Sequence, residues 1–121
     1  MKRSRVNPVS KKRSALNVTR RAFVLEILQE RIFCQAQIPR LCANYASDVH
    51  EIKTRARGGS ITDPDNVLAL CRPCHTFITD NPAFASENGF IVHAWSGEAD
   101  YIAAERARVA FLKGSDNFGA Y

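Results

Sequence analysis

Four cysteines do most to restrict what this chain of 121 residues can fold into. Two of them lie in the run Cys71-Arg-Pro-Cys74, whose short spacing lets two thiolates reach one ion. Cys34 and Cys42 can supply the other half of a tetrahedral site, although their wider spacing is a weak signal by itself. We therefore expect a structural zinc ion held by the four thiolates; the alternative is a set of small buried thiols.

Charge divides the chain into a basic arm and a body. Residues 1–21 carry eight of the 17 Lys and Arg residues and no acid, whereas residues 22–121 sum to −3. A cationic segment with few large apolar side chains buries too little surface to offset its ordering entropy, so a disordered arm is expected. Such arms bind phosphates by counterion release, which predicts nucleic-acid contacts from Lys11, Lys12 and Arg13. A solubilising tail is the alternative.

The sequence gives no sign of a membrane or a secretory route. No run approaches the ~18 consecutive apolar residues of a membrane-spanning helix. The N-terminal stretch lacks the apolar core of a secretory signal, so a cytoplasmic location is expected. Transit peptides to organelles also lack acidic residues, but the proline and the clustered charge of this stretch oppose that interpretation. No long apolar seam requires a dimer, which favours a monomer.

The spacing of apolar and turn residues predicts a small α+β domain. In chain order we expect an amphipathic helix over 20–33, a turn-rich knuckle over 35–41, a strand around 44–52, a loop over 53–65, a strand over 66–71 and a helix from residue 72. A further strand over 89–96, a helix over 98–113 and a frayed tail over 114–121 follow. Because neighbouring residues of a strand point to opposite faces, His50 and Glu51 should lie on opposite faces of the first strand.

The order strand, glycine-containing loop, strand and helix resembles the ββα-metal module of HNH endonucleases, or His-Me finger. The matching residues are Val49-His50-Glu51-Ile52, Gly58-Gly59, Asn66, Leu70-Cys71 and Cys74-His75. The resemblance covers residues 34–80, and the wider run is similar to small HNH proteins of actinobacterial phages and prophages. It implies an HNH domain with a zinc knuckle over 22–96, with the arm before it and a helix and tail over 97–121.

The resemblance implies roles for three residues of a candidate catalytic site. His50 and His75 fall on the ligands of a catalytic divalent ion, for which Mg²⁺, Mn²⁺ and Ni²⁺ are candidates, and Asn66 falls on the asparagine that fixes the loop and the general base. Some family members carry a second helix ligand where this chain has Thr79 and Asp80; water can replace it around Mg²⁺ or Mn²⁺.

Other interpretations of the same residues remain open at this point. His75 is also compatible with the structural zinc site, in place of Cys34 or Cys42, and Asn66 with a simple turn residue after Asp65. His93 is more typical of a packed histidine than of a ligand, and we assign it no catalytic role.

Glu51 is where the sequence departs from the family pattern, because a histidine general base is expected there. In one account Glu51 is the base, although a carboxylate is a weak base at its usual pKa of about 4.3 unless burial raises it. In a second, Glu51 binds the ion and His50 is the base, which strand alternation opposes. In a third, Glu51 faces away and the chain is a nucleic-acid-binding relic. The retained spacing of His50, Asn66 and His75 favours the first two accounts, and we prefer the first.

The implied function is metal-dependent hydrolysis of phosphodiester bonds in DNA. The phage resemblance suggests genome processing or packaging in the host cytoplasm, with a terminase as a candidate partner. Lys53, Arg55 and Arg57 lie in the loop that faces the nucleic-acid backbone in related enzymes, so phosphate contacts are predicted there; a solvated loop is the alternative. The alternative function is a non-catalytic zinc-containing module that binds nucleic acid or acts as an adaptor.

Overall fold

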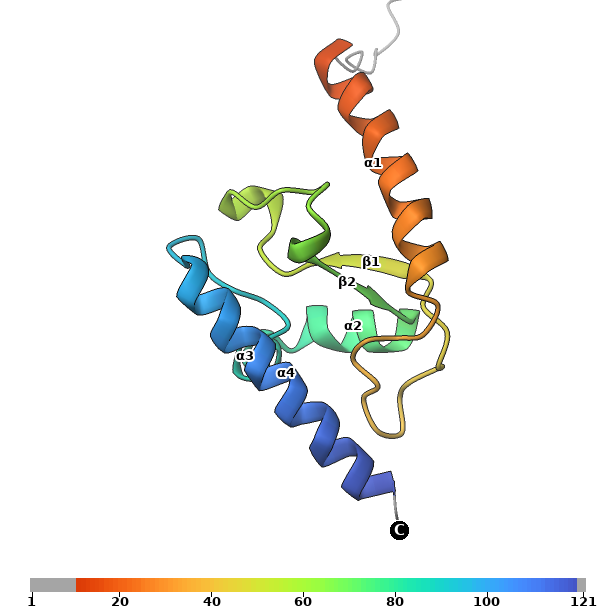
Figure 1. Ribbon diagram of the computed structural model, residues 1–121, viewed down its shortest axis with the longest axis vertical. Coiled ribbons are helices and arrows are strands. Elements are labelled where there is room, and N and C mark those ends of the chain that lie inside the picture. The colour runs from red at the N-terminus through yellow and green to blue at the C-terminus, as the bar shows by residue number, and fades with distance from the viewer. Residues whose placement is uncertain (1–10, 120–121) are drawn as a thin grey trace, which may run out of the picture.

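The computed structural model describes residues 11–119, which form four α-helices around a two-stranded antiparallel sheet (Figure 1). The elements in chain order are α1 (Lys11–Glu30), β1 (Asp48–Glu51), the 3-10 helices η1 (Arg55–Arg57) and η2 (Pro64–Asn66), β2 (Val67–Leu70), α2 (Arg72–Asp80), α3 (Pro82–Glu87) and α4 (Glu98–Gly119). The predicted α+β class and its two central strands are confirmed. None of the helices within the described residues combines the length and the apolar character needed to cross a bilayer.

The register of the sheet separates the two neighbours at the end of β1. His50 pairs with Leu68 and Glu51 with Val67, and directly paired residues of antiparallel strands share a face. Leu68 belongs to the core on the α2 side of the sheet, whereas Val67 packs with Ile27 of α1. His50 and Glu51 therefore lie on opposite faces, as strand alternation predicts.

The main core lies on the α2 side of the sheet. Leu70 of β2, Ile78 of α2 and Phe90 are fully buried there. The rings of Phe84 and Phe111 approach edge to face, 5.6 Å apart, which brings α4 against α3. The core is thus completed by segments that follow the ββα portion of the chain.

Helix α1 begins at Lys11, and not near residue 20 as predicted. Its second half packs on the sheet through Ile27, while its first half projects from the body (Figure 1). Residues 11–21 therefore belong to a helix rather than to a disordered arm. The reason is local: five of these eleven residues are Lys or Arg, which favour helix, and none is Gly or Pro, so the stretch extends a helix that packing has already nucleated. Residues 1–10 of the predicted arm lie outside the described residues.

The prediction of a strand over 89–96 is wrong. Val92 N–H donates to the carbonyl of Ile52 at 2.9 Å, but the segment then turns, with Ser96 N–H donating to the carbonyl of His93 at 3.0 Å. Phe90 and Val92 are buried in the core, but the single bond to Ile52 does not continue into a ladder, so the segment is not a strand. The tail prediction also changes, because α4 continues through residues 114–119.

The glycine pair of the β1–β2 loop offers a matched test of backbone packing. A Cβ at Gly59 would lie 1.8 Å from the carbonyl oxygen of Lys53. A Cβ at Gly58 would have no heavy atom within 4 Å, but the backbone of Gly58 has φ of +94°, which a residue with a side chain rarely adopts. Gly59→Ala should therefore lower the free energy of unfolding by about 3 kcal/mol or more, because backbone must move. Gly58→Ala should cost only about 1–2 kcal/mol of left-handed strain. Urea unfolding checks both; equal costs would contradict the packing of this loop.

Candidate metal centre and histidine site

The structure brings the four cysteines together from three parts of the chain. Cys34 follows α1, Cys42 ends the knuckle, and Cys71 and Cys74 lie at the start of α2. Their sulfur atoms all lie within 4.8 Å of one another, and the Sγ atoms of Cys42 and Cys71 are 3.9 Å apart. Sulfurs bound tetrahedrally to zinc at about 2.3 Å lie roughly 3.8 Å apart, so the cluster fits this ion. Four cysteines able to bind a metal such as zinc are therefore confirmed.

Backbone amides and neighbouring thiols form hydrogen bonds to the sulfur atoms of the cluster, and these bonds and burial shift the pKa values of the thiols. The N–H of Ala43 donates to Sγ of Cys71 and the N–H of Asn44 to Sγ of Cys42, each at 3.3 Å. A hydrogen bond from Cys74 lowers the pKa of Cys34, while burial raises the pKa of Cys42. All four thiols are free, and donors to sulfur of this kind stabilise the thiolates that a metal requires.

His75 is oriented by a carboxylate that the sequence analysis did not single out. Its Nδ1 lies 2.8 Å from Oδ2 of Asp48, and Nε of Arg72 lies 3.2 Å from the same oxygen. Asp48 is on β1, two residues before His50, so both side chains lie on the α2 face of the sheet. Strand alternation from His50 is the signal that could have found it. The contact holds the ring by Nδ1 and leaves Nε2 as its other coordinating nitrogen.

His50 is buried beside His75 and anchored in a similar way. Its Nε2 lies 2.7 Å from the carbonyl oxygen of Phe90, so Nε2–H donates and Nδ1 carries the lone pair. Burial lowers the pKa of His50 to about 4, which keeps the ring neutral at pH 7. The His50 and His75 rings meet edge to face with centroids 5.3 Å apart.

Two imidazoles, each held through one nitrogen by a protein oxygen, have the chemistry of ligands to a divalent ion. His50 would offer Nδ1 and His75 Nε2, with water or substrate oxygen completing the coordination. Among the described residues, the four cysteines are the group of three or more potential ligands that comes together, so the histidine pair would offer an ion at most two protein ligands. The cysteines are complete without His75, which removes the reason to place it in the zinc cluster.

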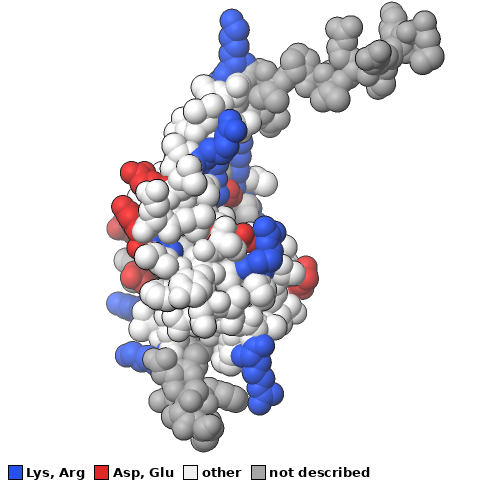
Figure 2. Space-filling model, turned by 90° about the vertical axis from the view of Figure 1, so that its right-hand side faces the viewer, with Lys and Arg blue, Asp and Glu red and all other residues white. Residues whose placement is uncertain are grey.

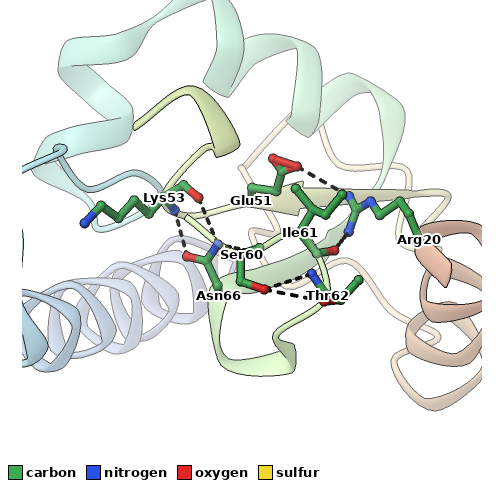
Figure 3. A network of polar contacts seen from close by, with 7 residues as sticks. All are labelled: Arg20, Glu51, Lys53, Ser60, Ile61, Thr62 and Asn66. Atoms are coloured by element: carbon green, nitrogen blue, oxygen red, sulfur yellow. Dashed lines mark hydrogen bonds and ion pairs between the residues drawn. The ribbon is translucent and has the colours of Figure 1, made fainter. Parts of the chain in front are cut away.

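Asn66 closes the loop between the strands. Its Oδ1 accepts from the N–H of Lys53 and the hydroxyl of Tyr101, each at 2.9 Å. Its Nδ2 donates to the carbonyls of Lys53 at 2.8 Å and Ser60 at 2.7 Å. The amide is buried, and its bonds to Lys53 and Ser60 hold the loop (Figure 3), while the bond from Tyr101 ties the loop to α4. Asn66 is therefore more than a turn residue, and none of these four bonds goes to a histidine.

Asn66→Asp should lower the free energy of unfolding by about 3 kcal/mol, because a carboxylate of the same shape cannot donate to two carbonyls. Tyr101→Phe is the matched control: it removes one of the four bonds and should cost about 1 kcal/mol. Urea unfolding at neutral pH measures both. An Asn66→Asp variant as stable as Tyr101→Phe would contradict the role of the amide as the main latch of this loop.

Glu51 contacts α1 rather than the histidines. Its Oε1 lies 3.8 Å from NH2 of Arg20, which also donates to the carbonyl of Ile61 (Figure 3). The carboxylate is partly exposed and stands at the last residue of β1, beside the loop. This geometry opposes the account in which Glu51 binds the ion and His50 is the base, because Glu51 lies on the other face of the sheet. It agrees with the account in which Glu51 faces away from the histidines.

The basic loop is partly tied down and partly free. Lys53 Nζ donates to the carbonyl of Ser96 at 3.3 Å and Arg57 NH1 to the carbonyl of Val92 at 3.2 Å. Arg55 is exposed on η1. The structure thus groups the three predicted phosphate contacts at one end of the sheet, against the segment that leads into α4.

The other predicted contacts lie apart from this loop. Lys11 and Lys12 are exposed on the projecting first turn of α1; the side chain of Arg13 lies outside the description. On the face shown in Figure 2, basic side chains recur along this projection and in separate groups on the body, with acidic side chains between them. The basic residues do not merge into one patch on that face.

Comparisons of the chain with protein-family models, with curated proteins and with solved structures found no match.

Proposed function

We propose that this chain is a metal-dependent endonuclease of the HNH type that hydrolyses phosphodiester bonds in DNA. The observation that carries the proposal is the anchored histidine pair: His50 bonds to the carbonyl of Phe90, His75 bonds to Asp48, and each ring keeps one nitrogen free for a ligand. A divalent ion held there would supply positive charge to the phosphate oxygens and the leaving 3′ oxygen.

The protein groups have distinct parts in the proposed reaction. Asp48 and the Phe90 carbonyl fix the histidine rings, and burial keeps His50 in the neutral form that binds metal. The Glu51 carboxylate accepts the proton of the attacking water, whose oxygen forms a bond to phosphorus while the bond to the 3′ oxygen breaks. Glu51 lies on the face of the sheet opposite to the histidine pair, so this step requires the attacking water to lie at the edge of the sheet, where the partly exposed carboxylate at the end of β1 could reach it.

The cysteine cluster and the loop would hold the residues of the proposed site in position. The cysteine cluster would tie α2, which carries His75, to the knuckle, and Asn66 fixes the loop that begins directly after Glu51. Exposed cations at Arg55 and on α1 would contact phosphates without reading sequence. By resemblance to small phage HNH proteins, genome processing or packaging with a terminase is the setting we propose.

Nicking of supercoiled plasmid by the zinc-loaded full chain tests the proposal. With Mg²⁺, Mn²⁺, Ni²⁺ or Zn²⁺ added in turn, we expect conversion to nicked circles with at least one ion, and loss of nicking when the added ion is withheld. Absence of nicking with all four ions, by protein that is folded and zinc-loaded, would overturn the enzyme proposal. It would favour the second candidate, a non-catalytic module that binds nucleic acid through its basic loop and helix.

A further inference from the structure

Trp95 is the most exposed large apolar side chain in the described part of the chain, with 82% of its surface accessible. A single exposed apolar residue is ordinary on a protein surface, so exposure alone indicates nothing. What distinguishes Trp95 is its orientation: the indole stacks flat on the ring of His93, with centroids 4.7 Å apart and planes 10° from parallel. The indole therefore rests on the imidazole through one face, while most of its surface stays accessible to a ligand.

A tight turn holds this stacked pair in place. The N–H of His93 donates to Oγ of Ser96, and the N–H of Ser96 donates back to the carbonyl of His93, both at 3.0 Å. The other side of the imidazole is tied as well, since Nε2 of His93 lies 3.4 Å from Oγ of Ser86 on α3. These bonds hold the imidazole of His93. The indole of Trp95 stacked on it therefore has less conformational entropy to lose when a second flat group stacks on its other face.

Two cations border the same turn. Lys53 and Arg57 donate to the carbonyls of Ser96 and Val92, which places their charged groups against the segment that carries Trp95. Each uses only one of its donors in these bonds, because an ammonium has three and a guanidinium five. In Figure 1 the loop with η1 lies beside the chain that enters α4, which agrees with these contacts.

We propose that Trp95, Lys53 and Arg57 form a binding site for an unpaired base and its phosphate in single-stranded nucleic acid. A fixed aromatic face beside cations has the chemistry of a stacking site for a base joined to a phosphate. In a continuous duplex the faces of the bases are covered by their neighbours, so only an unpaired base can reach the indole. Lys53 is two residues from Glu51, so the site adjoins the proposed catalytic strand. This inference rests on the proposed function, because it names the class of nucleic acid that the nuclease would bind.

The fluorescence of Trp95 tests this directly, because it is the single tryptophan of the chain. The zinc-loaded full chain, without added divalent ion, is titrated with an oligothymidylate of about twelve nucleotides and with a blunt-ended, fully paired duplex of similar charge. We expect saturable quenching by the single strand and little change with the duplex. Equal quenching by the two, or none by the single strand, would overturn the proposal.

Substitutions separate stacking from general attraction by charge. Measured by anisotropy of a labelled oligothymidylate, Trp95→Ala should weaken binding about tenfold and Trp95→Phe less. Lys53→Ala and Arg57→Ala should each weaken it about threefold and lower the salt dependence. The matched control is Tyr45→Ala, since Tyr45 is another exposed aromatic stacked on a neighbour, Phe33, and should bind normally. Trp95→Ala with unchanged affinity would refute the stacking role.

These results are independent of nicking. Single-strand binding through Trp95 without nicking in any metal would support this inference and the binding-module candidate together, while removing the endonuclease. Plasmid nicking without quenching would do the reverse.

Discussion

Cys71→Ser should abolish the cooperative fold of this protein. Cys71 joins the end of β2 to the start of α2, and it is buried in the main core together with Cys34 and Cys74. Structural zinc contributes about 10–16 kcal/mol in small zinc domains, which equals or exceeds the about 5–15 kcal/mol by which a typical domain is stable. With three thiolates left, the ion binds poorly and the knuckle loses its attachment to the helix.

Circular dichroism during heating, with zinc content measured on the same sample, checks this outcome. Wild type should bind zinc and unfold in one transition, and strong chelation should reproduce the Cys71→Ser result. The control is Ile78→Val, a buried position on the same helix, which should keep its zinc and lose only about 1 kcal/mol. A soluble, zinc-free Cys71→Ser protein that still unfolds cooperatively would show that the core does not depend on the ion.

Substitutions at the histidine pair should have the second-largest effects, on plasmid nicking. His75→Ala and His50→Ala would each remove one of the two proposed ligands of the ion, and each should reduce nicking by about 10²-fold or more. Asp48→Asn should reduce it by about 10- to 100-fold, because Asp48 acts through His75 as a positioning residue. A weaker affinity for the added ion in Asp48→Asn, measured from the metal dependence of nicking, separates this role from a general loss of stability. Thr79→Ala is the control on the same helix, since its hydroxyl bonds only to the His75 carbonyl and should leave nicking unchanged.

Glu51→Gln tests whether Glu51 is the general base of the proposed reaction. If the carboxylate is the general base, the isosteric amide should reduce nicking by about 10²- to 10⁴-fold and leave metal dependence unchanged. Glu30→Gln, an exposed carboxylate at the end of α1, should have no effect. Nicking at the wild-type rate in Glu51→Gln would reject Glu51 as the base.

Features that depend on local sequence were predictable. The Cys71-Arg-Pro-Cys74 run indicated the metal cluster, and the β-branched and turn residues around it predicted the two strands and the helix. Alternation along β1 correctly placed His50 and Glu51 on opposite faces. The start of α1 was wrong because charge pattern was given more weight than helix propensity over residues 11–21. The strand expected over 89–96 was wrong because the chain turns at His93–Ser96 after a single bond to Ile52, and local sequence does not show how far such a ladder continues.

The partners of the site residues were decided only by tertiary structure. The Phe90 carbonyl lies 40 positions from His50, and Tyr101 lies 35 positions from Asn66. Arg20 of α1 reaches Glu51 on the face of the sheet opposite to the histidines. Each contact depends on how the segment after α3, or helix α1, packs on the sheet, and the spacing within a motif carries no information about that packing. The sequence by itself thus determined which residues could bind a metal. Packing decided which nitrogen of each histidine is free and that Glu51 stands apart from the pair, because burial and long-range hydrogen bonds fix the orientation of a side chain.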